Sequence, residues 1–282
     1  VELAQIFHAL GARVTLMEVG PHILGGVDEE LALVLEQHLI KQGINLHLGC
    51  QVKDIGSGGQ GVLVRYATED GSDQVPATAV LAATGRSPRV QGLGLEHTAV
   101  KVSPHGVEVD QTLQTAEPGI YAVGDVLGQP MFAHWATAQC LALARHLLGL
   151  PGPFPKREHN AATIFSTPEL AMAGLTEDQC AKAGLEVGVA RYDFAQDARA
   201  QIGGHDKGLL KIVYEKSSRR VVGVHALVEG AADLMGEAAL LVRAGLPLEA
   251  IAGAIHPHPT LTESFVMAVR ATLAAEAVKR HE

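Results

Sequence analysis

The sequence predicts an α/β unit with a doubly wound parallel sheet, followed by a separate α+β domain. In residues 1–48, stretches with helical spacing of apolar residues alternate with short apolar strands. Alternation of this kind indicates parallel strands joined by right-handed crossovers. Beyond a proline- and glycine-rich stretch at residues 149–155, strand patterns come first and helix patterns follow. That order is typical of an antiparallel sheet covered by helices.

The α/β unit contains start and stop signals for its helices. Gly11 ends the first helix, Asp28 is placed to cap the second, and Gly43 ends it. No capping residue precedes the first helix, so we expect that the chain begins inside an element of a longer protein. The expected elements are a helix over residues 1–10, a strand over 13–18, a helix over 29–42 and a strand over 44–48.

Shorter β segments interrupt this pattern after Val52. A glycine-rich turn at residues 56–59 precedes a strand, so we expect a meander inserted before the last strand of the unit. Residues 85–110 are rich in glycine, proline and polar side chains, and we expect mainly a connection there, with one short strand near Val107. The expected elements are strands over residues 62–66, 79–83 and 120–123, then a helix from about His134.

Residues 149–155 mark the best domain boundary in the sequence. They contain three prolines and two glycines, and such a stretch cannot continue a helix. Strand and helix patterns resume after it. We expect strands near residues 162–165, 187–194, 209–214 and 221–226, then helices near 231–244 and 260–275.

Composition and charge exclude several classes of protein. Lys and Arg total 22 against 31 Asp and Glu, a net charge of −9, which argues against a nucleic-acid partner. No apolar run approaches the roughly 18 residues that span a bilayer. Cys50, Cys140 and Cys180 are too far apart for a zinc site or a disulfide framework. We expect a cytoplasmic protein with reduced thiols, no metal and no membrane partner.

Polar or flexible residues follow three of the apolar strands. Glu18 ends the strand over residues 13–18, where an acid can bind ribose hydroxyls, although an exposed glutamate at a strand end is commonly only solvated. Gly85 follows another strand and lets backbone approach a phosphate or sugar. Asp125, in Gly124-Asp125, can accept from ribityl or ribose hydroxyls, although Gly-Asp also forms ordinary turns.

The densest cluster of candidate catalytic residues lies at residues 256–263, which have the sequence His-Pro-His-Pro-Thr-Leu-Thr-Glu. Pro259 suits the first turn of a helix, which would place His258 at the helix entrance and Glu263 about one turn further. A carboxylate there can orient an imidazole and raise its basicity, as a general base for a thiol requires. The alternative is a proline-stiffened turn with a capping histidine. His256 is the less favoured base because it lies farther from Glu263.

Taken together, these segments resemble the pyridine nucleotide-disulfide oxidoreductases, from residue 1 to about residue 272. They stand in the family's order along the chain, which makes coincidence implausible. The matching segments are Val1-Glu2-Leu3-Ala4, residues 14–18, Ala83-Thr84-Gly85-Arg86-Ser87-Pro88, residues 119–125, Gly174-Leu175-Thr176-Glu177, and His258-Pro259-Thr260 with Glu263.

This resemblance implies cofactors and roles for particular residues. Glu2 would lie near the nicotinamide of NAD, Glu18 would bind the adenosine ribose, Val52 would touch the adenine region and Gly85 would approach the dinucleotide. Asp125 would bind FAD through its ribityl chain. The resemblance also implies that Ala133 contacts the flavin by its backbone, and that His258, oriented by Glu263, serves the active site of the other subunit of a homodimer.

Within the family, the paired histidines and Glu18 most resemble the NAD-using dihydrolipoamide dehydrogenases. The implied reaction oxidises a lipoyl dithiol through a redox disulfide and passes electrons by FAD to NAD, in some cases within a 2-oxoacid dehydrogenase complex. The alternatives are a glutathione- or mercuric-reductase-like NAD(P)H-dependent enzyme, or a non-catalytic dimerising fragment. Residues 279–282 lack the vicinal cysteines typical of mercuric reductases.

The sequence also departs from the family pattern. Trp135 stands where dihydrolipoamide dehydrogenases often have Lys. No redox C-x4-C pair, no FAD-binding glycine loop and no NAD fingerprint occurs, so we expect the chain by itself to be inactive. The implied division is a partial NAD-binding domain at residues 1–86, a central FAD-contacting segment at 87–156 and a dimerisation domain at 157–282.

Overall fold

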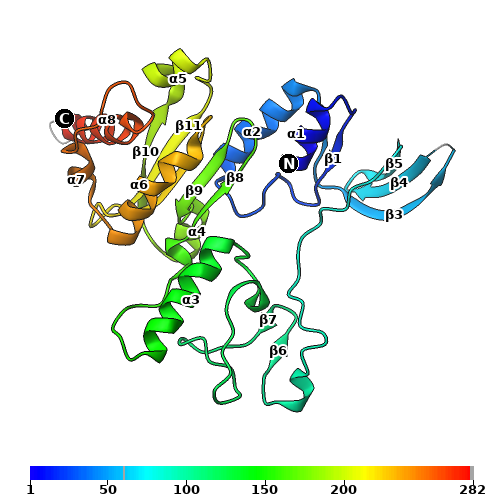
Figure 1. Cartoon of the computed structure of the whole chain (residues 1–282). Coiled ribbons are helices and arrows are strands. Elements are labelled where there is room, and N and C mark those ends of the chain that lie inside the picture. The colour runs from blue at the N-terminus through cyan, green and yellow to red at the C-terminus, as the bar shows by residue number, and fades with distance from the viewer. Residues whose placement is uncertain (60, 280–282) are drawn as a thin grey trace. The chain divides into compact units, whose positions relative to one another are not determined.

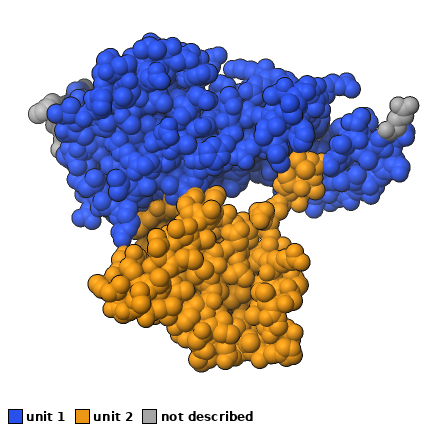
Figure 2. All heavy atoms as spheres, in the orientation of Figure 1, with its two compact units in different colours: residues 1–80, 161–282 blue, residues 81–160 orange. Residues whose placement is uncertain are grey.

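The computed structural model describes residues 1–59 and 61–279. The chain divides into two compact units, one of residues Val1–Val80 with Ala161–Glu282 and the other of residues Leu81–Asn160 (Figure 2). Residues 280–282, which end the predicted dimerisation domain and the sequence tail, lie outside the described residues. Among the described residues, no helix combines the length and apolar character needed to cross a bilayer.

The first elements confirm the predicted helix–strand alternation (Figure 1). Strands β1 and β2 pair in parallel, with Thr15 opposite Asn45. Asp28 caps α2 by accepting a hydrogen bond from the amide of Leu31 at 3.4 Å, and Gly43 ends it in the left-handed conformation at φ 100°. The elements are α1 (Glu2–Ala9), β1 (Thr15–Met17), α2 (Glu29–Gln42) and β2 (Asn45–His47).

The expected meander is present as a three-stranded antiparallel sheet. It consists of β3 (Gln51–Gly58), β4 (Gly61–Thr68) and β5 (Gly71–Ala77) in that order. A Cβ atom on Gly61 would lie 2.3 Å from the carbonyl oxygen of Ala77, so the close approach of β4 to β5 requires glycine there.

Two predicted strands do not form. Residues 79–83 have no strand structure, and the side chains of Val80 and Leu81 are 43% and 57% exposed. Residues 120–123 make one isolated bridge, between Tyr121 and Gln114. An apolar run becomes a strand only when a neighbouring strand offers its backbone groups. In the described part of the chain, the parallel sheet consists of β1 and β2 only, so residues 79–83 have no neighbouring strand with which to pair.

The unit of residues 81–160 consists mainly of turns around one long helix. The predicted helix near His134 is confirmed as α3 (Ala133–Leu147), and the predicted strand near Val107 is confirmed as β7. A Cβ atom on Gly128 would lie 2.0 Å from the carbonyl oxygen of His105, so this loop packs tightly against the β6–β7 hairpin. The remaining elements are η1 (Leu95–His97), β6 (Val102–Ser103), β7 (Gly106–Val107), η2 (Gly124–Leu127) and η3 (Arg157–His159).

The second domain is built on a five-stranded antiparallel sheet in the order β10-β11-β12-β9-β8, which confirms the α+β prediction. Its strands are β8 (Ala161–Ile164), β9 (Leu170–Gly174), β10 (Val187–Asp193), β11 (Leu209–Glu215) and β12 (Val221–Leu227). The sequence did not reveal β9, because its Leu-Ala-Met-Ala-Gly segment has little intrinsic strand preference. Pairing on both sides, with β12 and β8, makes it a strand.

Among the described residues, five helices accompany this sheet, and two of them were predicted. They are α4 (Glu177–Lys182), α5 (Ala198–Gly203), α6 (Ala231–Ala244), α7 (Leu248–Ala252) and α8 (Glu263–Lys279). The expectation that Pro259 lies in the first turn of the last helix is wrong, because α8 begins at Glu263. A residue before proline avoids the helical conformation, and both His256 and His258 precede prolines.

The apolar face of α2 continues the core of the sheet. Leu31, Leu35 and Leu39 are fully buried and belong to one cluster with Leu170 of β9 and Leu227 of β12. The burial of each leucine side chain stabilises the folded state by roughly 1.5–3 kcal/mol. The helix α2 and the antiparallel sheet are therefore packed in one compact unit.

Candidate functional site

His258 and Glu263 form the pair that the sequence pattern predicted. Nδ1 of His258 lies 3.0 Å from Oε1 of Glu263, and the imidazole side chain is 71% exposed. The amide of Thr260 donates to Oε2 of Glu263 at 2.9 Å. This amide and the His258 imidazole lower the pKa of the Glu263 carboxyl. An ionised carboxylate that accepts from Nδ1–H leaves Nε2 of His258 free to accept a proton.

A second imidazole–carboxylate pair lies beside the first. Nε2 of His256 is 3.1 Å from Oε1 of Glu237 on α6, and the His256 side chain is only 10% exposed. Sequence reasoning missed Glu237. The sequence showed Glu237 only as an acid within the predicted helix over residues 231–244. Folding brings that helix, α6, beside the loop that carries His256.

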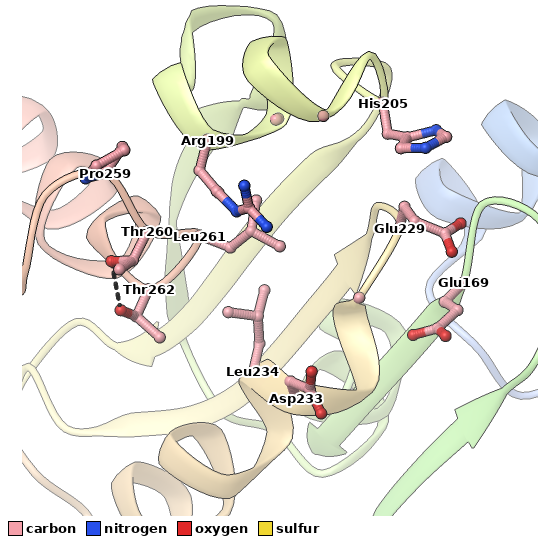
Figure 3. Close-up of a pocket in the computed structure, with 13 residues that line it drawn as sticks. Glu169, Arg199, His205, Glu229, Asp233, Leu234, Pro259, Thr260, Leu261 and Thr262 are labelled. Carbon is pink, nitrogen blue, oxygen red and sulfur yellow. Dashed lines mark hydrogen bonds between the residues drawn. The ribbon is translucent and has the colours of Figure 1, made fainter.

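A cleft of about 460 Å³ borders the segment that follows His258 (Figure 3). Thr260 and Thr262 line one wall and are joined by a hydrogen bond of 2.9 Å between their hydroxyls. Leu234 and Leu261 supply its apolar surface, and Arg199 reaches into it. The acidic lining residues are Glu169, Glu229 and Asp233.

Glu18 and Val52 lie near the carboxyl ends of β1 and β2. The amide of Cys50 donates to the carbonyl oxygen of Glu18 at 3.0 Å, which brings the start of β3 beside it. Oε1 of Glu18 accepts from the amide of Gly20 at 2.8 Å, which orients the carboxylate. Ligands of doubly wound sheets bind at this strand end. Glu2 is placed differently, since its Oε1 accepts from the amide of Phe165 at 2.7 Å.

The unit of residues 81–160 holds Gly85, Asp125 and Ala133. Gly85 has φ 125° with open space where a Cβ would stand. Asp125 is exposed at the start of η2, and no described residue donates a hydrogen bond to its carboxylate oxygens. No side chain caps α3, whose first residue is Ala133. These features fit a polar dinucleotide cofactor. The carboxylate of Asp125 can accept hydrogen bonds, the amides at the start of α3 can donate them, and the backbone at Gly85 is open to a close approach.

The structure brings some of the predicted residues together and leaves others apart. His258 is joined to Glu263, and Glu18 lies beside the start of the strand that carries Val52. Gly124, next to Asp125, packs on α3, where its amide donates to Oε1 of Gln139 at 2.8 Å. Within residues 1–59 and 61–279, no hydrogen bond or ion pair links the histidine pair to the groups near β1.

A polar network near β2 was not predicted. The hydroxyl of Tyr66 lies 3.1 Å from Nδ1 of His47 and 3.3 Å from Oδ2 of Asp73. Nδ2 of Asn45 lies 3.0 Å from Nε2 of His47. Burial and the neighbouring carboxylate of Asp73 raise the pKa of Tyr66. These four residues come from three strands, so no local sequence pattern indicates them.

A buried ionic cluster was also not predicted. Nζ of Lys211 lies 2.8 Å from Asp28, 2.9 Å from Glu30 and 2.6 Å from Glu177, and its side chain is 3% exposed. Burial opposes the charged form of the lysine, but the hydrogen bonds to the carboxylates outweigh it and raise the pKa of Lys211. The cluster fixes the N-terminal end of α2 to β11.

Two family models match the chain. The pyridine nucleotide-disulphide oxidoreductase model matches residues 1–140, and the dimerisation domain of the same family matches residues 160–269. The chain belongs to the pyridine nucleotide-disulphide oxidoreductase family, as the ordered motifs in the sequence predicted. Proteins of this family are oxidoreductases, and this chain includes the domain through which they dimerise.

Curated relatives are named dihydrolipoyl dehydrogenase. The enzyme of Thermus scotoductus is 36% identical over 96% of this chain and 59% of its own length. The mitochondrial enzyme of Mesocricetus auratus is 35% identical over 94% of this chain and 56% of its own length. The chain therefore spans a little over half the length of these relatives.

Solved structures of the family share the fold. LpdA of Mycobacterium tuberculosis aligns with a TM-score of 0.87 and 27% identity, over 96% of this chain and 59% of LpdA. RclA of Escherichia coli, an HOCl-induced flavoprotein disulfide reductase, aligns with a TM-score of 0.85 and 26% identity, over 95% of this chain and 61% of RclA. A pyridine nucleotide and a flavin are thus both cofactors of the family. This confirms the expected cofactors, FAD and NAD, for the family.

Proposed function

We propose that this chain forms part of an enzyme that oxidises dihydrolipoamide, with FAD as the electron carrier and NAD as the final acceptor. One observation supports the proposal most strongly. An exposed imidazole, His258, is bound through Nδ1 to an ionised carboxylate, that of Glu263, and so presents Nε2 as a base. Relatives named dihydrolipoyl dehydrogenase, at 35–36% identity, support the choice of substrate.

His258 would take the proton from a substrate thiol. Its Nε2 accepts the proton, and the carboxylate of Glu263 stabilises the imidazolium that forms. The resulting thiolate attacks one sulfur of a redox disulfide, the S–S bond breaks, and the other sulfur leaves as a thiolate. Cys50, Cys140 and Cys180 are all free thiols here, so they do not supply that disulfide. We therefore expect no dihydrolipoamide turnover from these 282 residues alone.

FAD would be held partly by Asp125, whose exposed carboxylate can accept from ribityl hydroxyls, and by the uncapped amides at Ala133. When bound, FAD supplies the two-electron relay between thiols and nicotinamide. NAD would contact Glu18 at the adenosine ribose, Val52 near the adenine and Gly85 along the dinucleotide. The prediction that Glu2 lies near the nicotinamide remains a proposal.

Cofactor preference provides a direct test of Glu18. An acidic side chain hydrogen-bonds the two ribose hydroxyls of NAD and repels a 2′-phosphate, so we expect NAD to be preferred over NADP. Steady-state kinetics of the full protein that contains this sequence should give the higher kcat/KM with NAD. A higher kcat/KM with NADP would remove Glu18 from this role.

We further propose the domain division at residues 1–86, 87–156 and 157–282, a homodimer formed through the last segment, and a cytoplasmic location. Assembly into a 2-oxoacid dehydrogenase complex is a separate proposal. Light scattering of the chain tests the homodimer. A monomer at micromolar concentration would contradict it.

A second candidate function is a disulfide reductase that runs electrons from the nicotinamide toward a disulfide or a metal ion. The likeness to RclA, a flavoprotein disulfide reductase, favours it. The assay that separates the two candidates compares dihydrolipoamide-dependent reduction of NAD with NAD(P)H-dependent reduction of glutathione disulfide and of mercuric ion. The proposed function requires the first activity to dominate, in a protein that shows flavin absorbance.

A further inference from the structure

Two histidines on one loop are each bound to a carboxylate from a different helix. The loop of residues 253–262 runs from the end of α7 to the start of α8. His256 is bound to Glu237 of α6 at 3.1 Å, and His258 is bound to Glu263 of α8 at 3.0 Å. The loop is thus held between α6 and α8.

The two pairs differ in what can reach them. The side chain of His258 is 71% exposed, whereas that of His256 is 10% exposed and its Nδ1 is buried without a hydrogen-bond partner. A general base must come within hydrogen-bond reach of the proton it removes. His256 is therefore shielded from a substrate thiol, and its function must lie in its contact with Glu237.

That contact is a polar link between the loop and α6. Residues 255–258 make no backbone–backbone hydrogen bond in the described structure. The carbonyl oxygen of Pro257 accepts from the hydroxyl of Thr260 at 2.7 Å, within the same loop. A segment with so few backbone hydrogen bonds opens locally at low cost in free energy. The hydrogen bond from His256 to Glu237 limits that opening.

We propose that Glu237 and His256 are positioning residues that hold the loop so that Nε2 of His258 meets a substrate thiol in the geometry for proton transfer. The inference rests on the proposed role of His258 as the base. Helix α6, which carries Glu237, packs against β9 and β12. The pair therefore transmits the rigidity of the sheet to a loop that would otherwise vary in position.

The first test uses the 282-residue chain and needs no cofactor. With ¹⁵N-labelled histidine, the ring-nitrogen chemical shifts report which nitrogen of neutral His258 carries the proton. The wild type should show the single Nδ1–H form that donates to Glu263. Glu237→Leu removes the acceptor for His256 and should give a mixture of both forms at His258. Glu237→Gln keeps an acceptor oxygen and should match the wild type.

A matched control is Glu186→Leu, because Glu186 is exposed and its side chain makes no hydrogen bond within residues 1–59 and 61–279. It should leave the His258 signals unchanged. Should Glu237→Leu not fold, His256→Phe keeps a ring of similar size without the donor and should give the same mixture. A single unchanged Nδ1–H form of His258 in the folded Glu237→Leu or His256→Phe variant would overturn the positioning role.

The second test uses the full protein that contains this sequence. Glu237→Leu should lower kcat for dihydrolipoamide oxidation roughly 10-fold, less than the roughly 10²-fold that a 1 Å misplacement of a catalytic group can cost, with KM nearly unchanged. Reduction of an artificial dye by NADH needs no thiol base and should keep its rate. An unchanged kcat for dihydrolipoamide would contradict the inference. A wild-type protein without dihydrolipoamide oxidation would instead contradict the proposed function, and the tautomer measurement would still decide the positioning role.

Discussion

The antiparallel sheet of residues 161–227 and the segment of residues 79–130 have similar apolar patterns in sequence but different structures. The first forms five strands, and each of its inner strands pairs on both sides. The second forms a single two-stranded hairpin, β6 with β7, and leaves Val80 and Leu81 exposed. The difference shows that an apolar run specifies a strand only when its hydrogen-bonding neighbour is supplied.

The same contrast holds for the candidate site residues. In the domain with the antiparallel sheet, His258 and Glu263 are already joined by a hydrogen bond between their side chains. In the segment of residues 79–130, Gly85 and Asp125 are exposed, and among the described residues none hydrogen-bonds to the carboxylate of Asp125. We therefore expect substitutions in the first region to change stability strongly, and those in the second to act mainly through cofactor binding.

The largest expected effect on stability is at Lys211. Lys211→Met leaves Asp28 without its cation at a buried site, and Glu30 and Glu177 lose a partner. Breaking a buried ion pair in this way costs about 3–5 kcal/mol. Urea unfolding of the chain measures the loss. The control is Lys182→Met, which breaks an exposed pair with Asp178 and should cost about 0.5 kcal/mol or less. Equal losses in both variants would contradict the account of the cluster.

A smaller effect is expected from truncation of apolar side chains in the two regions. Ile212 of β11 is fully buried, and Ile212→Ala should lower the free energy of unfolding by about 2–5 kcal/mol. Leu81→Ala should change it by about 0.5 kcal/mol or less, because the leucine is 57% exposed. Comparable losses at both positions would show that residues 79–83 are packed in solution.

The sequence predicted the antiparallel domain better than the doubly wound unit for a physical reason. Hairpin partners such as β11 and β12 are close in sequence, so local patterns predict both members of the pair. Residues 79–83 would need a parallel partner distant in sequence, and no local pattern shows whether it is present. The His258–Glu263 pair was predictable because five positions separate its members. Glu237, nineteen positions from His256, became evident only when α6 was placed beside the loop.

The smallest effect expected in this comparison concerns Tyr214 at the edge of the antiparallel core. Burial and the hydrogen bond to Glu276, 2.9 Å long, raise the pKa of Tyr214 to about 12. The stability that this tyrosine contributes is present below its ordinary pKa of 10 and is lost as pH rises through about 12. Absorbance titration should include one tyrosine that ionises at about pH 12. Glu276→Gln should lower that pKa toward 10, and an unchanged titration would contradict the assignment.

The central claim, that His258 is the base and His256 a positioning residue, is tested most directly in the full protein that contains this sequence. His258→Gln should lower kcat/KM for dihydrolipoamide oxidation roughly 10²- to 10⁴-fold, the usual contribution of one proton-transfer residue, with normal flavin content. His256→Gln should lower it roughly 10-fold, less than the roughly 10²-fold that a 1 Å misplacement of a catalytic group can cost. Near-normal activity in His258→Gln together with lost activity in His256→Gln would contradict the account.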